Sequence, residues 1–316
     1  MKIKFLFFLI ILFLLNFLFT HWVNSYYTQI VCMLGINIIM AVSLNLINGQ
    51  TGQFSLGHAG FMAIGAYTSA AITFYARAHL LSIFFFLPPS FVETLLFIAA
   101  LFLGGTAALL AGLLIGIPTL RLRGDYLAIA TLGFSEIIRV LVLNLDFVGG
   151  ARGFSDIPEY SNFFWIFLFA VLSIVVVNNL VRSIKGLSFG AIREDEIAAE
   201  SVGIPAARYK VIAFGTGAFL AGIGGGLFAH LMAYLHTNSF SFLKSIEFVV
   251  MIVLGGLFSI TGAIVGAILL TVLPEFLRVV SDWRMILYSL LLIVMMLGLP
   301  QGLLGRREWG WLKKKE

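Results

Sequence analysis

Apolar residues run along this chain in long blocks, and only short polar stretches separate them. An α-helix needs about 20 predominantly apolar residues to cross the hydrocarbon core of a bilayer. The blocks therefore predict an all-α fold, a polytopic α-helical membrane protein with about ten transmembrane segments. We place these segments at residues 5–21, 29–47, 56–76, 92–117, 126–144, 162–181, 210–233, 246–256, 260–275 and 285–304.

The number of spans depends on residues 246–275, a stretch that is uncharged after Glu247 and too long for one helix. We divide it into two short segments joined by a bend, because glycines interrupt its middle at Gly255, Gly256 and Gly262. A single long span, with a re-entrant piece elsewhere, is the alternative, which leaves about eight to ten spans. The chain forms one transmembrane domain over residues 1–316, with sizeable polar stretches only at 77–90, 145–161 and 182–209.

The composition agrees with this pattern. Apolar residues make up 60% of the 316 residues and charged residues 11%, against about 25% charged residues in a soluble domain. The mean hydropathy is +1.04, which excludes a soluble globular enzyme and makes membrane lipid the surroundings of most of the chain. Cys32 is the only cysteine, so an intrachain disulfide and a thiolate metal cluster are excluded.

The first apolar block has features of a signal peptide, because Lys2 and Lys4 precede it. Residues 20–23 read Thr-His-Trp-Val, however, and this is not a small-residue cleavage site. We therefore expect an uncleaved first span.

The basic residues indicate the orientation. With a cytoplasmic N-terminus, the cytoplasmic segments hold 14 of the 20 basic residues, and a basic C-terminus on the same side requires an even number of spans. In a membrane protein the net charge of +5 reports this orientation, so no nucleic acid is expected as a partner. The 14 residues are Lys2, Lys4, Arg121, Arg123, Arg182, Lys185, Arg193, Arg208, Lys210, Arg306, Arg307, Lys313, Lys314 and Lys315.

Residues 45–60 form an uncharged, glycine-punctuated polar stretch between two spans. Unwound backbone at membrane depth is tolerated only in a protein interior or beside a water-filled path. We therefore expect helix breaks at Gly49 and Gly52, and polar side chains that line or shape a solute path. The alternative is a tight helix-packing site with a short polar turn. The candidate path residues are Asn48, Gln50, Gln53, Ser55 and His58.

A second glycine-broken stretch lies in the other half of the chain, where Gly255, Gly256 and Gly262 are expected to break a helix. Paired interrupted segments in two halves of a membrane protein are typical of transporters built from repeats. Whether this chain contains such a repeat stays open.

The loop 182–209 is the most charged part of the chain. We predict a short cytoplasmic helix from Arg193 to Val202 that ends at Gly203 and Pro205. Because so short a helix is unstable alone, another protein is expected to pack on it; a solvated connector is the alternative. The candidate docking residues are Arg193, Glu194, Asp195, Glu196, Ala198, Ala199, Glu200 and Gly203.

Few residues suggest chemistry inside the membrane. Glu136 and Arg139 lie three apart on one helix face, either as a structural pair or as part of a proton-coupled carrier. His58, His230 and His236 lack the spacing of metal ligands, so interior or boundary histidines are expected. The chain has no G-x-x-x-x-G-K-[ST] motif, and we predict no catalytic residue, no cofactor and no metal.

Several of these stretches resemble one known family, the membrane permease subunits of bacterial ABC importers for branched-chain amino acids, of the LivM type. The ending Leu299-Pro300-Gln301-Gly302-Leu303 also fits. The sister type, LivH, typically reads more like I-N-F-A-H-G where this chain has Phe54–Gly60. The other matching stretches are Asn45–Tyr67, Leu120–Arg139, Ala191–Leu220 and Leu254–Leu277.

The resemblance implies a permease in a bacterial inner membrane that works by alternating access, with both termini cytoplasmic. Its partners would be a second permease subunit of the LivH type, two ABC ATPase subunits and an extracytoplasmic solute-binding protein. The 193–202 helix would be the coupling helix that docks on an ATPase. In the family's Glu-Ala-Ala pattern, followed by Gly four residues on, Ala198, Ala199 and Gly203 fit, but Ile197 stands at the Glu position. Glu196 and Glu200 flank this position, so which carboxylate, if any, meets the ATPase stays open.

Three other functions remain as alternatives. The first is an ion-coupled secondary transporter that uses Glu136 or Glu247. The second is a membrane scaffold without transport activity. The third is an ABC permease for urea or short amides.

Overall fold

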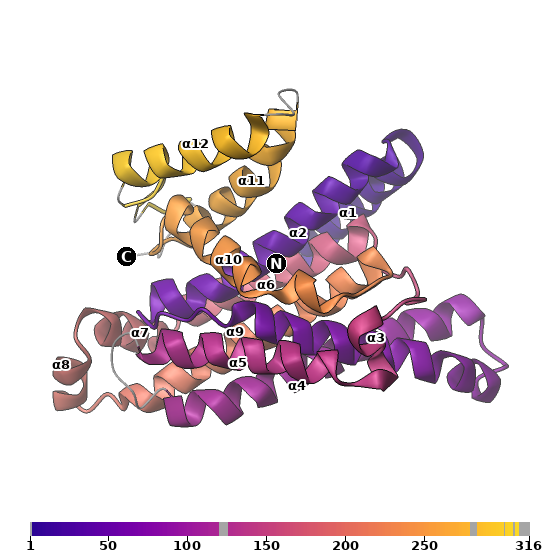
Figure 1. The fold of residues 1–316 in the computed structure, drawn as a ribbon, viewed down its shortest axis with the longest axis horizontal. Helices are drawn as coiled ribbons and strands as arrows, with labels where there is room; N and C mark the ends of the chain where they lie inside the picture. The colour runs from indigo at the N-terminus through magenta and orange to yellow at the C-terminus, as the bar shows by residue number, and fades with distance from the viewer. Residues whose placement is uncertain (1, 120–125, 279–282, 300, 306, 310–316) are drawn as a thin grey trace.

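The computed structural model describes residues 2–119, 126–278, 283–299, 301–305 and 307–309 (Figure 1). Arg121, Arg123, Pro300, Arg306 and Lys313–Lys315 lie outside these described residues. Within the described residues the chain is helical, and its one β-type contact is an isolated antiparallel bridge between Phe154 and Leu235. The predicted all-α fold is confirmed.

The helices follow the apolar blocks of the sequence closely. The first six long helices are α1 Lys2–Trp22, α2 Ser25–Asn45, α3 His58–Ile83, α4 Pro89–Thr119, α5 Tyr126–Leu143 and α6 Phe163–Arg182. The next are α7 Ile184–Glu194, α8 Glu196–Ser201, α9 Ala206–Met232, α10 Phe242–Gly255, α11 Ile260–Phe276 and α12 Arg284–Gly298. Four short turns complete the order: η1 Leu46–Gln50, η2 Asp146–Val148, η3 Gly150–Arg152 and η4 Thr237–Phe240.

The described part of the chain contains seven segments that are long and apolar enough to cross a membrane. Two shorter apolar helices, 260–276 and 286–298, accompany them. The helix α1 coincides with the predicted first span. The chain is therefore a multi-pass helical membrane protein, and the division of 246–275 into two segments agrees with the separate helices α10 and α11.

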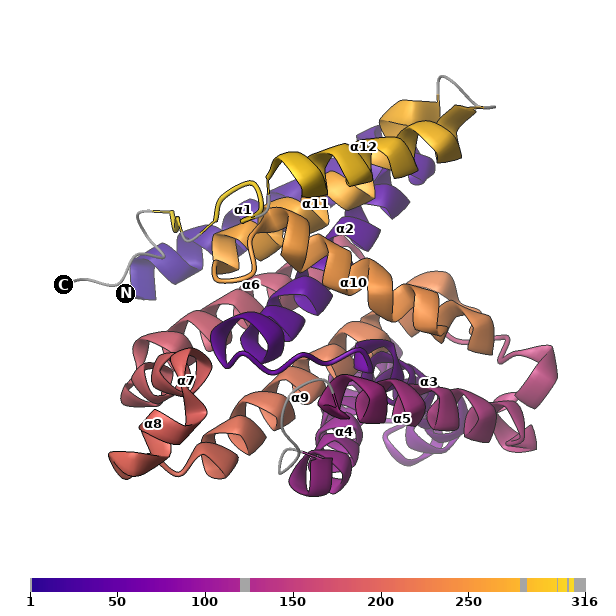
Figure 2. The ribbon, with the colours of Figure 1, turned by 60° about the vertical axis from the view of Figure 1, so that its left-hand side comes forward.

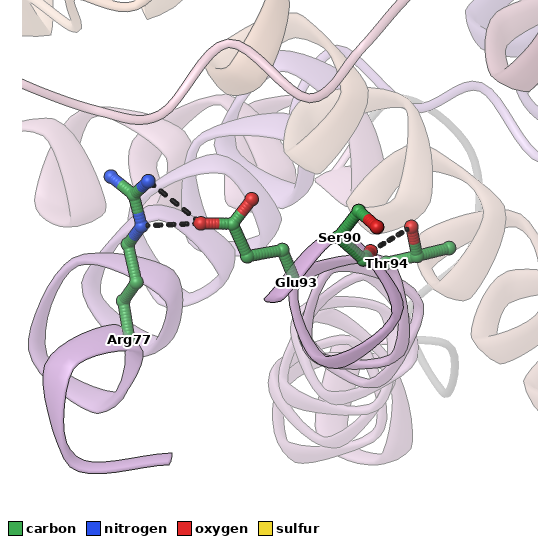
Figure 3. A network of polar contacts seen from close by, with 4 residues as sticks. All are labelled: Arg77, Ser90, Glu93 and Thr94. Atoms are coloured by element: carbon green, nitrogen blue, oxygen red, sulfur yellow. Dashed lines mark hydrogen bonds and ion pairs between the residues drawn. The ribbon is translucent and has the colours of Figure 1, made fainter. Parts of the chain in front are cut away.

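The predicted polar stretch 77–90 is shorter than expected. The helix α3 continues to Ile83, and α4 begins at Pro89. Charged side chains are accommodated on these helix ends because Arg77 Nη2 lies 2.7 Å from Glu93 Oε1, an ion pair between α3 and α4 that Figure 3 shows.

The centre of the molecule is a close crossing of α3, α4 and α9. Small residues allow the backbones to approach, as is common where membrane helices pack. A Cβ atom on Gly65 of α3 would overlap backbone atoms of Gly222 in α9, and one on Gly104 of α4 would lie 2.7 Å from the carbonyl oxygen of Gly65. The helices α2, α6, α10 and α11 pack around this centre.

Figure 2 shows that the beginning of α1, the end of α12 and the pair α7–α8 lie toward the same end of the molecule. The helix α8 projects beyond the bundle at the left of Figure 1. The loops that carry η3 and η4 meet elsewhere, where the bridge between Phe154 and Leu235 joins them.

Candidate functional site

The first part of the site is the polar stretch after α2. The helix continues into the π-turn η1 and then opens into residues 51–57, here called the extended segment, before α3 begins at His58. Amide side chains satisfy freed backbone groups. Asn48 Nδ2 donates to the Ser55 carbonyl at 3.3 Å, and the Ser55 N–H donates to Asn48 Oδ1 at 3.2 Å. This pairing fixes the extended segment against η1.

The extended segment has two faces, as in a strand. Thr51, Gln53 and Ser55 are buried, whereas Gly52 and Phe54 are exposed, the Phe54 side chain by 43%. The buried polar face has incomplete hydrogen bonding. Both amide atoms of Gln53, Ser55 Oγ and His58 Nδ1 have no hydrogen-bond partner among the described residues. A buried polar atom left in this state costs about 1–3 kcal/mol, so this segment is held in place at an energetic cost.

All five predicted path residues are therefore buried in this chain. The relative exposure is 8% for Gln50, 6% for Asn48 and 4% for Gln53, while Ser55 and His58 are fully buried. His58 Nε2 lies 2.8 Å from Ser43 Oγ of α2. The sequence pattern did not reveal that the outward face of this segment is the apolar one.

The second part of the site is the interruption between α10 and α11, residues 256–259, here called the break. The helix α10 ends at Gly255, and Gly256 has a φ of 129°, a conformation that favours glycine. Ser259 caps α11, because its Oγ accepts from the Gly262 N–H at 2.9 Å. Gly262 was predicted to break a helix, but it lies in the first turn of α11. There its missing side chain lets α10 and α11 approach each other.

Glu308, a residue that no sequence pattern singles out, holds the start of α11. Its Oε1 accepts from the Ile260 N–H at 2.7 Å, and its Oε2 accepts from the Thr261 N–H at 3.2 Å and from the Thr261 hydroxyl. A carboxylate at a helix N-terminus is favourable because it faces unpaired N–H groups and the positive end of the helix dipole. No sequence signal marks this role, since 47 or more positions separate Glu308 from its partners.

The two glycine-broken stretches meet directly. Asn45 Nδ2 donates to the Leu257 carbonyl at 2.6 Å, and Gln50 Nε2 donates to the Phe258 carbonyl at 3.4 Å. A Cβ on Gly49 would overlap the Leu257 oxygen, so the close approach requires glycine. The break and η1 are therefore joined by direct contacts.

The third part of the site is the predicted docking element. The structure corrects the single helix expected from Arg193 to Val202, because α7 ends at Glu194 and a separate α8 runs from Glu196 to Ser201. Asp195 divides them. Its Oδ1 accepts from the Ile197 N–H at 2.8 Å and the Ala198 N–H at 3.0 Å, which makes it the N-cap of α8.

Several of the predicted docking residues face inward. Ala199 is 3% exposed and packs with Ile192 and Ala206. Glu196 Oε2 lies 2.6 Å from Lys210 Nζ at the start of α9. The outward surface of α8, in which we include the turn directly after it, consists of Ile197, Ala198, Glu200, Ser201, Val202 and Gly203.

Gly203 supplies the predicted stop after α8. Its φ of 85° places it in the left-handed region, which favours glycine after a helix. Glu194 lies on the exposed side of α7 and pairs with Arg193 at 3.1 Å.

The predicted pair of charges within a span is confirmed. Arg139 Nε donates to Glu136 Oε2 at 2.7 Å within α5. On α10, Lys244 Nζ lies 2.9 Å from Glu247 Oε2. Both carboxylates that could serve a proton-coupled carrier are therefore engaged in local ion pairs.

The family described as branched-chain amino acid transport system / permease component matches residues 26–299. The high-affinity branched-chain amino acid transport system permease protein LivM of Salmonella typhimurium is 37% identical over 311 residues, which cover 87% of this chain and 69% of the relative. LivM of Escherichia coli is 38% identical over 304 residues, covering 85% and 68%. LivH of Salmonella typhimurium is 28% identical over 165 residues, covering 51% and 53%. No solved structure matches this chain.

Proposed function

This chain belongs to the family of branched-chain amino acid transport permease components, and from that premise we propose that it is the LivM-type permease subunit of an ATP-driven importer. Its cargo is a branched-chain amino acid. The observation that carries the proposal is the arrangement of the site: a projecting cytoplasmic element, α7–α8, lies against the two glycine-broken stretches. ATP is hydrolysed by separate subunits, since this chain has no P-loop motif.

We place the contact with an ATPase subunit on the outward surface of α8. Ile197 is 64% exposed and Val202 is 76% exposed, so this part of the polar loop presents two apolar side chains outward. Among the candidate carboxylates, Asp195 caps α8 and Glu196 pairs with Lys210. Glu200 is exposed beside the two apolar residues, so it is the carboxylate we assign to the ATPase.

We propose that the membrane is the bacterial inner membrane and that both termini are cytoplasmic. The start of α1 and the end of α12 lie toward the end of the molecule that carries α7–α8 (Figure 2), and the positive-inside pattern supports a cytoplasmic position for that end. The opposite end, with the loops around Phe154 and Leu235, would face an extracytoplasmic solute-binding protein.

We propose that the solute passes between this chain and a second permease of the LivH type. Phe54 projects from the extended segment and offers an apolar surface that suits the side chain of a branched-chain amino acid. Asn48, Gln50, Gln53, Ser55 and His58 shape the path by holding that segment. The buried atoms of Gln53 and Ser55 that have no hydrogen-bond partner in the described part of the chain would gain hydrogen bonds in a second state, and this favours alternation between two conformations.

Reconstitution tests this proposal. The permease, its second permease, the ATPases and the solute-binding protein are placed in proteoliposomes, and uptake of labelled leucine, isoleucine and valine is measured with and without ATP. Urea and acetamide serve as competing solutes, and an ion gradient without ATP tests a secondary carrier. We expect ATP-dependent uptake of the amino acids. Uptake driven by the gradient alone, or preference for the amides, would contradict the proposal.

A substitution on α8 tests the docking surface. Ile197→Asp should abolish co-purification of the ATPases and uptake, because a carboxylate cannot be buried in an apolar contact without a partner. Phe86→Asp is the matched control, since Phe86 is an apolar residue with 98% exposure in the connection between α3 and α4. Wild-type ATPase binding by Ile197→Asp would refute the docking surface.

A further inference from the structure

Arg193 occupies an unexpected position at the end of α7. It belongs to the predicted docking residues, yet its side chain is only 20% exposed. The side chain points away from the outward surface of α8 and toward the break, because its guanidinium carbon lies 4.7 Å from the ring centroid of Phe258. An arginine stacked in this way is not available to a protein that docks on α8.

The same residue lies against the extended segment. An added Cβ on Gly52 would lie 3.0 Å from Arg193 Cγ and 3.3 Å from Arg193 Cα. The backbone of α7 is thus packed directly on the glycine that begins the exposed face of that segment. Arg193 is therefore in contact with both glycine-broken stretches at once.

These contacts connect α8, the break and η1. Asp195 alone separates α7 from α8, so a displacement of α8 acts on Arg193 within two residues. The break is joined to η1 by the bonds from Asn45 and Gln50 to its carbonyl groups. Phe258 is consequently connected to η1 through the bond from Gln50, and η1 is connected to the extended segment through Asn48.

Arginine suits this task for a physical reason. Its planar guanidinium stacks on an aromatic face, whereas the ammonium of lysine is a compact, strongly hydrated charge. Glu194 Oε1 lies 3.1 Å from the guanidinium and keeps part of its charge paired at the surface.

We propose that Arg193 is the positioning residue that transmits movement of the ATPase-docked α8 to the break and the extended segment. This inference rests on the proposed function. Arg193 then couples α8 to the break and the extended segment inside this chain. The contact with the ATPase itself is made by Ile197, Val202 and Glu200.

The test measures leucine uptake and ATP hydrolysis together in reconstituted transporter. Arg193→Ala and Phe258→Leu should keep ATPase binding and ATP hydrolysis but lower uptake per ATP by roughly 3- to 30-fold, the range expected for loss of one cation–π contact. Arg193→Lys should lose part of the coupling, and Phe258→Trp should retain it. A residue that only stabilised the fold would lower both rates together.

Arg278→Ala is the matched control. Its guanidinium carbon lies 4.8 Å from the ring centroid of Tyr26, a similar stack far from α7–α8, so uptake per ATP should stay at the wild-type value. Unchanged uptake per ATP in Arg193→Ala and Phe258→Leu would overturn the inference. So would loss of ATPase binding in Arg193→Ala, because Arg193 would then contact the ATPase itself.

Two comparisons keep the test decisive. If the Arg193→Ala permease itself does not fold and insert in the membrane, uptake per ATP in Phe258→Leu compared with Phe258→Trp decides, since both retain an apolar side chain and only tryptophan retains an aromatic ring. Failure of the proposed function shows itself differently, as absence of ATP-dependent uptake in the wild-type protein.

Discussion

The ion pair between Glu196 and Lys210 is predicted to hold α8 on α9. The two charged atoms lie 2.6 Å apart, and the Lys210 side chain is 9% exposed while that of Glu196 is 27% exposed. Removing one partner of a buried pair costs about 3–5 kcal/mol, because the remaining charge stays buried without compensation. Partial exposure of Glu196 lowers this to about 2–3 kcal/mol.

The expected effect is a larger population of molecules in which α8 has detached locally from α9. A loss of about 2–3 kcal/mol corresponds to roughly a 30- to 140-fold increase in the opened population. In Glu196→Gln and in Lys210→Met, hydrogen exchange of the α8 amides in the assembled transporter should accelerate by that factor. The double variant Glu196→Gln/Lys210→Met removes both charges and should regain most of the protection.

The result that refutes this reasoning is clear. If either single variant exchanges at the wild-type rate, the ion pair does not hold α8. If the double variant exchanges as fast as the single variants, the loss has another cause than a buried unpaired charge. Amides of α3, far from this pair, serve as the internal control for global unfolding.

Three further predictions concern the packing of the site. Gly49→Ala should lower the thermal unfolding temperature, because its Cβ would overlap a backbone oxygen of the break at a cost of about 1–3 kcal/mol; Gly190→Ala, with open space around it, should not. Glu308→Ala should cost about 1–3 kcal/mol at the start of α11, seen as faster hydrogen exchange there, and Glu308→Gln should lie between it and wild type. Ala199→Arg should detach α8 from its neighbours rather than only block its outer face, because Ala199 is buried. The expected result is normal membrane insertion with rapid hydrogen exchange of the α8 amides. Amides of α8 that stay protected would contradict it.

Much of this protein could be predicted from local patterns. Apolar blocks of about 20 residues fix helices because lipid offers no hydrogen bonds to an unpaired backbone. The helix interruptions could also be predicted, since η1 and the break fall where glycines and amide residues interrupt the apolar blocks. The charged loop also marked the position of α7–α8, and the Glu136–Arg139 pair followed from helical spacing.

The differences from the sequence-based expectation arose where tertiary contacts decide which way a side chain faces. The sequence treated Ala199, Glu196 and Arg193 alike as docking residues, whereas packing on Ala206, an ion pair with Lys210 and a stack on Phe258 turn all three inward. A six-residue helix has no strong preference of its own for which face is buried, so its neighbours determine that face.

The sequence alone therefore determined that the chain lies in membrane lipid, where its helices run and where they are interrupted, because each of these depends on residues within about 20 positions of one another. The tertiary structure decided which side chains work inside the chain and which remain for partners. Asn45 reaches the break from 212 positions away, and Glu308 caps a helix from 48 positions away. Such contacts exist only once the helices have packed, and no periodicity along the chain encodes them.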